Sequence, residues 1–254
     1  MKIVRFGVKG GKEVFWGKVE GVNVYKVVGN PYEAIELSGD VFNLNEIHIL
    51  PPCEPQKIVL VGLNYRDHAE ELGMDIPDEP LIFLKPPTAL IGDGDSIVYP
   101  EISQRVDYEA ELAFVVSKKA KNVSVEDARD YIFGYTCLND VTARDLQKKD
   151  GQWTRAKSFD TFCPVGKWIE TEFDWRNKKI EAYLNGKLKQ SSNTNNFIFG
   201  VEEIFSFVSK IMTLNPGDLI STGTPPGVGA MSPGDVVEVK IEGIGVLSNK
   251  IVKK

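Results

Sequence analysis

The sequence has few cysteines and few histidines. Its 254 residues include three cysteines, Cys53, Cys137 and Cys163, which form no CxxC pair, and two histidines, His48 and His68. An odd, dispersed set of cysteines is typical of reduced thiols in a cytosolic protein rather than of a disulfide framework. We therefore expect a cytoplasmic protein without disulfide bonds.

The chain also lacks a basic excess and a long apolar segment. Its 30 lysines and arginines against 36 aspartates and glutamates give a net charge of −6. This balance offers no electrostatic footprint for nucleic acid and no attraction to anionic lipid. No long apolar run follows the basic start of residues 1–19, so we expect neither a signal peptide nor a membrane span. An anionic substrate would need local positive charge from lysine, arginine or a metal ion.

Short strand patterns dominate what the sequence does contain. Apolar residues at helical spacing predict a helix over 201–212, and shorter helices are expected at 124–131 and 140–148. Many strands with few helices favour a mainly β fold of the α+β class over a doubly wound sheet. Alternating or compact apolar segments between glycine- and proline-rich turns predict strands at 2–8, 14–19, 22–27, 57–61, 81–84, 106–116, 180–184, 219–222, 236–241 and 246–252.

A proline cluster at 51–55 interrupts any regular element and is typical of a linker. At 254 residues the chain is long enough for one substantial core and a small accessory domain. The cluster therefore predicts a small β-rich N-terminal domain over residues 1–52 and a second domain over residues 56–254.

The segment 106–112 alternates acidic and apolar residues. In a strand, Asp107, Glu109 and Glu111 share one face, and this face continues into apolar residues, so the carboxylates are expected at the mouth of an interior surface. Like charges there repel, and a divalent cation relieves the repulsion. Carboxylates without histidine or cysteine suit Mg²⁺, and after it Mn²⁺ or Ca²⁺, rather than zinc. Asp140 is the candidate third ligand, although an ExE pattern taken alone is more often an exposed strand.

His68 follows a predicted strand and opens a segment that could form a helical turn, with Glu71 three residues later. On a helix the two side chains face the same way. The carboxylate then orients the imidazole and stabilises its protonated form, so that the pair can deprotonate a water molecule. Without other motifs such a pair is more often a surface contact. His48 lies just before the proline cluster, and we expect a structural role for it.

Three basic residues and a glycine-rich loop complete the candidates. Lys85 ends an apolar strand, so its charge either reaches solvent or points into a cleft. Lys157 could neutralise a substrate oxyanion and Arg144 could bind a carboxylate, although each taken singly is more often solvated. The loop 221–229, which contains Thr224, lacks the patterns of phosphate- and dinucleotide-binding loops. It could present N–H groups and a hydroxyl to a carboxylate, or be a tight structural turn.

Taken together, these segments resemble the fumarylacetoacetate hydrolase superfamily, in particular its small acylpyruvate hydrolase and oxaloacetate decarboxylase-like branch. The resemblance implies a roll of β-sheets of the β-sandwich type, a small N-terminal accessory domain and a homodimer. The matching segments occur in the family's order over residues 57–230: GLNYRDHAEE, PLIFLKPPTALIG, VDYEAELAFVV, GYTCLNDVTARDLQ, TRAKSFDTFCPVG and LISTGTPPGVG.

The resemblance also implies roles for individual residues, matched motif by motif. The His–Glu pair would lie on a segment that orders over bound ligand. The implied site consists of the metal ligands Glu109, Glu111 and Asp140, the water-activating dyad His68 and Glu71, the enolate-stabilising Lys157, and Lys85, Arg144, Gln147 and Thr224 for substrate recognition.

The implied activity is Mg²⁺-dependent hydrolysis of a C–C bond in an acylpyruvate-type 2-oxo acid, such as fumarylpyruvate or acetylpyruvate. The same site could decarboxylate or tautomerise oxaloacetate, or isomerise or decarboxylate 2-hydroxyhepta-2,4-diene-1,7-dioate, and fold and site alone do not choose among these reactions. We favour hydrolysis. A catalytically silent metal or oxo-acid binding protein is a more distant alternative, because the sequence retains the dyad and Lys157.

Overall fold

The structure, a computed structural model that describes residues 1–253, is built mainly of β-strands. Its largest sheet has eleven strands in the order β4-β3-β2-β1-β15-β12-β11-β18-β6-β7, with β5 also paired to β1. These strands are β1 (Lys2–Val8), β2 (Val14–Glu20), β3 (Asn23–Val28), β4 (Glu36–Asn43), β5 (Ile47–Leu50), β6 (Ile58–Val61), β7 (Ile82–Lys85), β11 (Ala110–Val116), β12 (Ile132–Asn139), β15 (Ile169–Glu170) and β18 (Leu219–Ser221).

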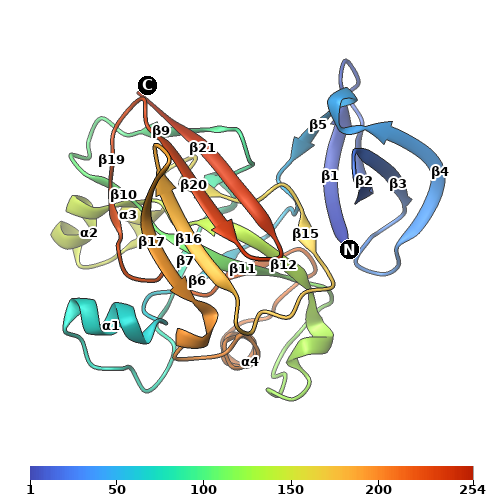
Figure 1. The fold of residues 1–254 in the computed structure, drawn as a ribbon. Coiled ribbons are helices and arrows are strands. Elements are labelled where there is room, and N and C mark those ends of the chain that lie inside the picture. Colours follow the sequence, from blue (N-terminus) through green and yellow to red (C-terminus); the bar gives the residue numbers. More distant parts are fainter. Residues whose placement is uncertain (254) are drawn as a thin grey trace.

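A five-stranded sheet packs across the middle of the large one. Figure 1 shows strands β16, β20 and β21 in front of β11 and β12, so that the two sheets form stacked layers. Its order is β17-β16-β20-β21-β9. The strands are β9 (Ser96–Tyr99), β16 (Lys179–Leu184), β17 (Lys187–Asn193), β20 (Val236–Ile241) and β21 (Gly245–Lys253).

The main core lies between these two layers. Leu112 and Phe114 of β11 and Ile180 and Ala182 of β16 are completely buried. Each large apolar side chain removed from water contributes roughly 1.5–3 kcal/mol, so this interface is a principal source of stability. It also fixes the position of β11, which begins immediately after Glu109. The mainly β, α+β fold predicted from the sequence is confirmed.

Two small sheets and four α-helices complete the described part of the second domain, residues 56–253. The helix predicted over 201–212 is confirmed by α4, which buries an apolar face against the core. None of the helices formed by residues 1–253 is long and apolar enough to cross a membrane. The remaining elements are β8 (Leu90–Ile91), β10 (Val106–Tyr108), β13 (Thr142–Ala143), β14 (Cys163–Pro164), β19 (Gly229–Met231), α1 (Arg66–Leu72), α2 (Arg144–Asp150), α3 (Thr154–Lys157) and α4 (Val201–Ile211).

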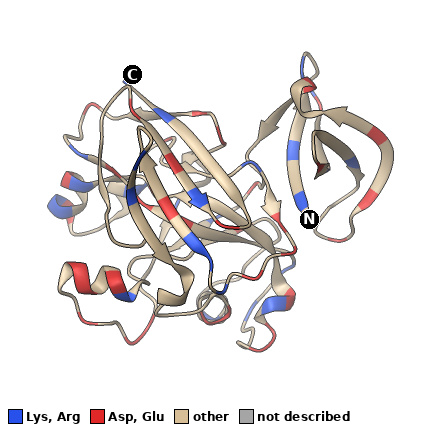
Figure 2. Cartoon of the chain, in the orientation of Figure 1, with Lys and Arg blue, Asp and Glu red and all other residues tan. Residues whose placement is uncertain are grey.

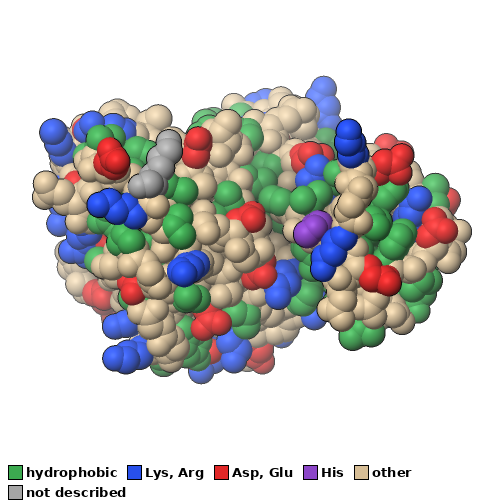
Figure 3. Space-filling view, turned by 90° about the horizontal axis from the view of Figure 1, so that it is seen from above, with side chains coloured by type: hydrophobic (Ala, Val, Ile, Leu, Met, Phe, Trp, Pro, Cys, Tyr) green, Lys and Arg blue, Asp and Glu red, His purple; other side chains and the backbone are tan. Residues whose placement is uncertain are grey.

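Strands β1–β5 form a separate lobe, drawn in blue at the right of Figure 1. The lobe is joined to the rest through the pairing of β1 with β15, in which Lys2 lies opposite Glu170, and through an ion pair between the N-terminal ammonium and Glu170. Acidic and basic residues are interspersed over both lobes (Figure 2). The face seen from above carries both signs of charge among hydrophobic side chains (Figure 3).

The continuous strand predicted over 106–116 is wrong at one residue. The chain leaves one sheet and joins another at Glu109, because β10 pairs with β13 and β19 whereas β11 pairs with β12 and β18. The backbone N–H of Glu109 donates to Oδ1 of Asn139 (2.9 Å) instead of to a strand partner. At this break the Glu109 side chain lies where the small sheet that contains β10 meets the large sheet that contains β11.

Two predicted short helices also differ from the structure. Residues 140–143 are not helical: Asp140 follows β12, the short strand β13 comes next, and helix α2 begins only at Arg144. The helix expected over 124–131 is reduced to a 3₁₀ turn over Ala128–Tyr131. Pairing of β10 with β13 explains the first difference, because its ladder hydrogen bonds compete with helix formation.

Candidate active site

Three buried carboxylates lie close together where strand β10 of the small sheet is followed by strand β11 of the large sheet. Oxygen atoms of Glu109, Glu111 and Asp140 all lie within 4.8 Å of one another, and the three residues are 6%, 1% and 1% exposed. Pairing of β11 with β12 brings them together, because Ala110 lies opposite Asn139 in the ladder. The backbone N–H of Asp140 donates to the carbonyl of Glu109 over 2.9 Å.

The protein balances the three carboxylates unevenly: Glu109 and Asp140 form ion pairs with basic side chains, and Glu111 forms none among residues 1–253. Burial alone would raise the pKa of Glu109, but the Lys157 ammonium and the Arg144 guanidinium outweigh it and lower that pKa to about 2. Burial, together with repulsion from Asp140 and Glu109, raises the pKa of Glu111 well above its ordinary value. Among residues 1–253, Glu111 accepts hydrogen bonds only from the Ser221 hydroxyl and the backbone N–H of Gly223.

A divalent cation fits this cluster. The ligand atoms are all oxygen, which hard cations such as Mg²⁺ and Mn²⁺ prefer, and a cation would offset the repulsion that raises the pKa of Glu111. The backbone at Gly223 has φ 88°, a conformation that glycine adopts without strain, and it aims its N–H at the Glu111 carboxylate. Glu109, Glu111 and Asp140 could therefore hold the metal.

Two lysines flank the cluster with different surroundings. Nζ of Lys157 lies 2.9 Å from Oε2 of Glu109 and 2.5 Å from Oδ2 of Asp140. Burial would lower the pKa of Lys157, but the two carboxylates hold it above its ordinary value. Nζ of Lys85 lies 2.8 Å from Oδ1 of Asp140 and donates to three backbone carbonyls, those of Val141, Lys157 and Phe162. Lys85 thus fixes the loops around Asp140.

Arg144 and Gln147 form one hydrogen-bonded unit at the start of helix α2. Arg144 binds Oδ2 of Asp107 through Nε (2.8 Å), Glu109 through Nη2, and Oε1 of Gln147 through Nη1 (2.6 Å). Thr224 accepts a hydrogen bond from Nε2 of Gln190 over 2.8 Å, which leaves its hydroxyl proton free to donate. These contacts orient three polar side chains that could bind the carboxylate of a ligand.

His68 and Glu71 lie on helix α1 and contact each other. Nδ1 of His68 is 2.8 Å from Oε2 of Glu71, and Oε1 of Glu71 accepts a hydrogen bond from the backbone N–H of Gly227 over 3.0 Å. Because Nδ1 is engaged, Nε2 of His68 is the nitrogen available for proton transfer. The pairing expected from the sequence spacing is therefore present.

A cavity of about 480 Å³ joins the dyad to the carboxylate cluster. Glu111 and Lys85 lie outside its wall. An apolar part of the wall includes Leu72, Met74 and Trp153. The predicted site residues that line the cavity are His68, Glu71, Glu109, Asp140, Arg144, Gln147, Lys157 and Thr224.

Two wall residues with evident roles were not predicted as site residues. Asp107 lies between two guanidinium groups, with Oδ1 2.8 Å from Nε of Arg105 and Oδ2 2.8 Å from Nε of Arg144, so it fixes both arginines at the wall instead of joining the metal ligands. The acidic alternation placed Asp107 on the correct strand face and could have identified it. Trp153 packs on Phe83 with ring centroids 5.1 Å apart, and no local sequence signal indicated that contact.

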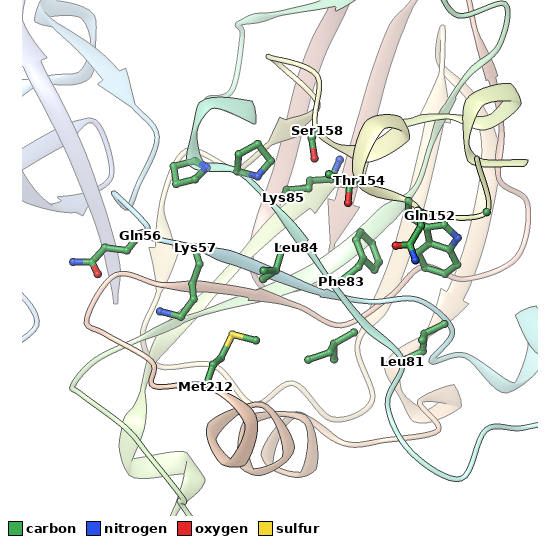
Figure 4. Close-up of a pocket in the computed structure, with 15 residues that line it drawn as sticks. Gln56, Lys57, Leu81, Phe83, Leu84, Lys85, Gln152, Thr154, Ser158 and Met212 are labelled. Atoms are coloured by element: carbon green, nitrogen blue, oxygen red, sulfur yellow. The ribbon is translucent and has the colours of Figure 1, made fainter. Parts of the chain in front are cut away.

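A second hollow, of about 920 Å³, runs along β7 (Figure 4). It shares Leu81, Phe83 and Trp153 with the first cavity. Its lining contains no aspartate, glutamate or histidine, so it offers neither a metal ligand nor a general base. Lys85 belongs to its wall, but the ammonium is engaged with Asp140 and the carbonyls. The smaller cavity is therefore the candidate active site.

Metal-free protein is expected to lose stability as the pH rises. A carboxyl with a raised folded pKa, as at Glu111, contributes stability below its unfolded pKa of about 4.3 and loses it as the pH approaches the folded value. A bound divalent cation offsets the repulsion that raises this pKa. The Tm difference between protein in Mg²⁺ and protein in EDTA should therefore widen as the pH rises above about 4.3. Calorimetry in both buffers measures this, and parallel curves would contradict it.

The chain matches known proteins over almost its whole length. The family model described as fumarylacetoacetate (FAA) hydrolase C-terminal matches residues 57–252, and the model described as Rv2993c-like, N-terminal matches residues 1–52. The oxaloacetate tautomerase fahd2, mitochondrial, of Xenopus laevis is 45% identical over 86% of this chain and 73% of its own.

The solved structures that resemble this chain include proteins named for other activities. The 5-carboxymethyl-2-hydroxymuconate delta-isomerase of Mycobacterium smegmatis superposes with a TM-score of 0.94 at 38% identity, covering 100% of both chains. Maleylpyruvate hydrolase of Sphingobium sp. SYK-6, in complex with manganese(II) and pyruvate, superposes with a TM-score of 0.81 at 29% identity, covering 100% of this chain and 99% of its own. Tautomerase, isomerase and hydrolase thus all occur among proteins similar to this one.

Proposed function

The chain belongs to the fumarylacetoacetate hydrolase family, and we propose that it is a divalent-metal-dependent enzyme that tautomerises oxaloacetate or a closely related 2-oxo acid. The observation that carries this proposal is one cavity whose wall holds the histidine–glutamate dyad together with Glu109 and Asp140, two of the three clustered carboxylates. The named tautomerase at 45% identity supports the choice of reaction. Manganese and pyruvate in the hydrolase complex support a metal and a 2-oxo acid, and the all-oxygen ligand set favours Mg²⁺ or Mn²⁺.

The residues of the cavity suit this chemistry. A bound cation would supply Lewis-acid polarisation of the oxygen atoms of the substrate. His68, oriented by Glu71, removes a proton from C3 of the keto form through Nε2 and returns it to the C2 oxygen, so that keto and enol forms interconvert without loss of atoms. Arg144 and Gln147 orient the carboxylate of the substrate, and the apolar wall limits access of water.

Hydrolysis of an acylpyruvate, the reaction favoured from the sequence, is the second candidate. It is supported by the same dyad, since a carboxylate-backed imidazole also suits activation of a water molecule. The two reactions differ in what His68 deprotonates, carbon C3 in one and water in the other. Isomerisation or decarboxylation of a hydroxy-diene-dioate needs only proton transfer and would use the same groups.

A substrate panel tests the proposal. We expect purified protein with Mg²⁺ or Mn²⁺ to accelerate decay of the enol absorbance of oxaloacetate, to lose this activity in EDTA, and to regain it when metal is added back. The same preparations are assayed with acetylpyruvate and fumarylpyruvate, with pyruvate release as the readout. Release of pyruvate without tautomerase activity would favour the second candidate, and inactivity on the whole panel would refute both.

A further inference from the structure

Helix α1, which carries the dyad, is too short and too exposed to hold its own position. It has seven residues, of which only His68 and Ala69 are buried, and its last residue, Leu72, is 53% exposed. Isolated helices of this length are not stable in water, because nucleation costs more than a few hydrogen bonds return. Contacts with other elements must therefore fix α1 against the carboxylate cluster.

Asp67 makes one group of these contacts, to two side chains outside α1. Its Oδ2 accepts hydrogen bonds from the Ser192 hydroxyl (2.5 Å) and from Nδ2 of Asn196 (2.9 Å), and the latter also donates to Ser192 over 3.0 Å. Ser192 belongs to β17 and Asn196 to the 3₁₀ turn Thr194–Asn196. Hydrogen bonds to a charged acceptor are shorter and stronger than neutral ones. The three side chains tie the first turn of α1 to the edge of the five-stranded sheet.

Asp67 also contacts His68 of the dyad directly. Its second oxygen, Oδ1, accepts a hydrogen bond from the backbone N–H of His68 over 3.0 Å. A second attachment lies one turn later, where Glu71 binds the N–H of Gly227. Removal of the Asp67 contacts would leave α1 attached through Glu71, on its more exposed side, and through the buried residues Asn64 and Tyr65 that precede it.

We propose that Asp67, Ser192 and Asn196 form a latch that positions His68 for proton transfer. Asp67 is a positioning residue in this proposal, because it acts through His68 and belongs neither to the carboxylate cluster nor to the residues that line the cavity. The proposal rests on the proposed function for the role of His68. It adds that three residues outside the reacting groups set the turnover rate, and two of them, Ser192 and Asn196, also lie outside the motifs that carry the resemblance.

The latch is tested with Asp67→Ala, the double variant Ser192→Ala/Asn196→Ala, and the triple variant that combines them. We expect Asp67→Ala to lower kcat about 10- to 100-fold, since misplacement of a catalytic group by about 1 Å costs up to 100-fold. KM and the dissociation constant for Mn²⁺ should stay within about twofold, because the carboxylate cluster belongs to other elements. The triple variant should lose no more turnover than Asp67→Ala, because the three residues form one network.

Glu70→Ala is the matched control. Glu70 is an exposed residue of α1 without a side-chain hydrogen bond among residues 1–253.

Hydrogen exchange separates this inference from the proposed function. Amides of residues 66–72 should exchange faster in Asp67→Ala than in the wild type or in Glu70→Ala, while amides of β11 and β12 stay unchanged, and this readout needs no substrate. Unchanged exchange in α1 would overturn the latch even if activity fell. Equal losses of metal affinity, thermal stability and kcat would also overturn it, since they indicate general destabilisation. An inactive wild type whose α1 amides still respond to Asp67→Ala would refute the function and retain the latch.

Discussion

Replacement of Glu111 by glutamine is expected to abolish metal binding and at the same time to stabilise the metal-free protein. Glutamine has the shape of glutamate and can still accept hydrogen bonds from Ser221 and Gly223, but it adds no third charge to the cluster. Metal binding needs that charge, whereas the empty cluster is strained by it, as the raised pKa of Glu111 indicates. The two effects therefore have opposite signs, which a merely disruptive substitution would not produce.

The expected loss of turnover in Glu111→Gln is at least about 1,000-fold, because Lewis-acid stabilisation is worth several kcal/mol and each 1.36 kcal/mol changes a rate tenfold. The Tm in EDTA should rise by ~2–4 °C for each kcal/mol of repulsion removed. Calorimetry with and without Mn²⁺ measures both effects, together with the oxaloacetate assay. Glu181→Gln is the control. Glu181 is also buried, but it lies on β16, outside the carboxylate cluster, and forms an ion pair with Lys179 of the same strand. A metal-induced rise in Tm that persists in Glu111→Gln would contradict the assignment of Glu111 as a ligand.

The fold was predictable where the sequence pattern is local. Helix α4 follows from apolar residues at helical spacing, and β20 has the bounds Val236–Ile241 expected from its alternation. The break at Glu109 was not predictable in this way, because the alternation of acidic and apolar residues continues through it. The break results from competition between two sets of strand partners that come from distant parts of the chain, and no window of sequence contains both.

The features of the candidate site were also predictable where they are local in sequence, and not where they depend on contacts between distant segments. The shared face of Glu109 and Glu111 and the spacing of His68 and Glu71 are local features. That Asp140 joins the two glutamates depends on the pairing of β11 with β12. The sequence offered Asp140 only as a candidate third ligand, the family resemblance implied the same role, and neither indicated this pairing. The roles assigned to these residues stay predictions until the variants are measured.

The same reasoning explains why the sequence did not predict the hydrogen bonds of the latch or those of Lys85. Ser192 contacts Asp67 across 125 positions of the chain, and Lys85 reaches backbone carbonyls 56 to 77 positions away. A serine in a strand and a lysine at a strand end are ordinary surface residues by their local context. Only the packing of the sheets shows that one holds the dyad helix and the other holds the loops around Asp140.

Replacement of His68 by alanine is expected to lower turnover about 100- to 10,000-fold, the range found for a positioned acid–base group. The affinity for Mn²⁺ should stay nearly unchanged, because His68 bonds to Glu71 and makes no contact with the carboxylate cluster. Stopped-flow assays of oxaloacetate and titration calorimetry with Mn²⁺ measure the two quantities. Lost metal affinity would instead make His68 a ligand and would contradict the division between dyad and metal site.

The sequence provides its own control for this experiment, since it has only one other histidine. His48 lies on β5 in the N-terminal lobe, so His48→Ala should leave turnover unchanged. Glu71→Gln supplies the second test: it keeps the shape of the side chain but removes the charge that stabilises protonated His68. If His68 takes a proton during turnover, Glu71→Gln must lower kcat in the same direction as His68→Ala, and the double variant must lose little more than His68→Ala alone, because the two side chains act as one unit.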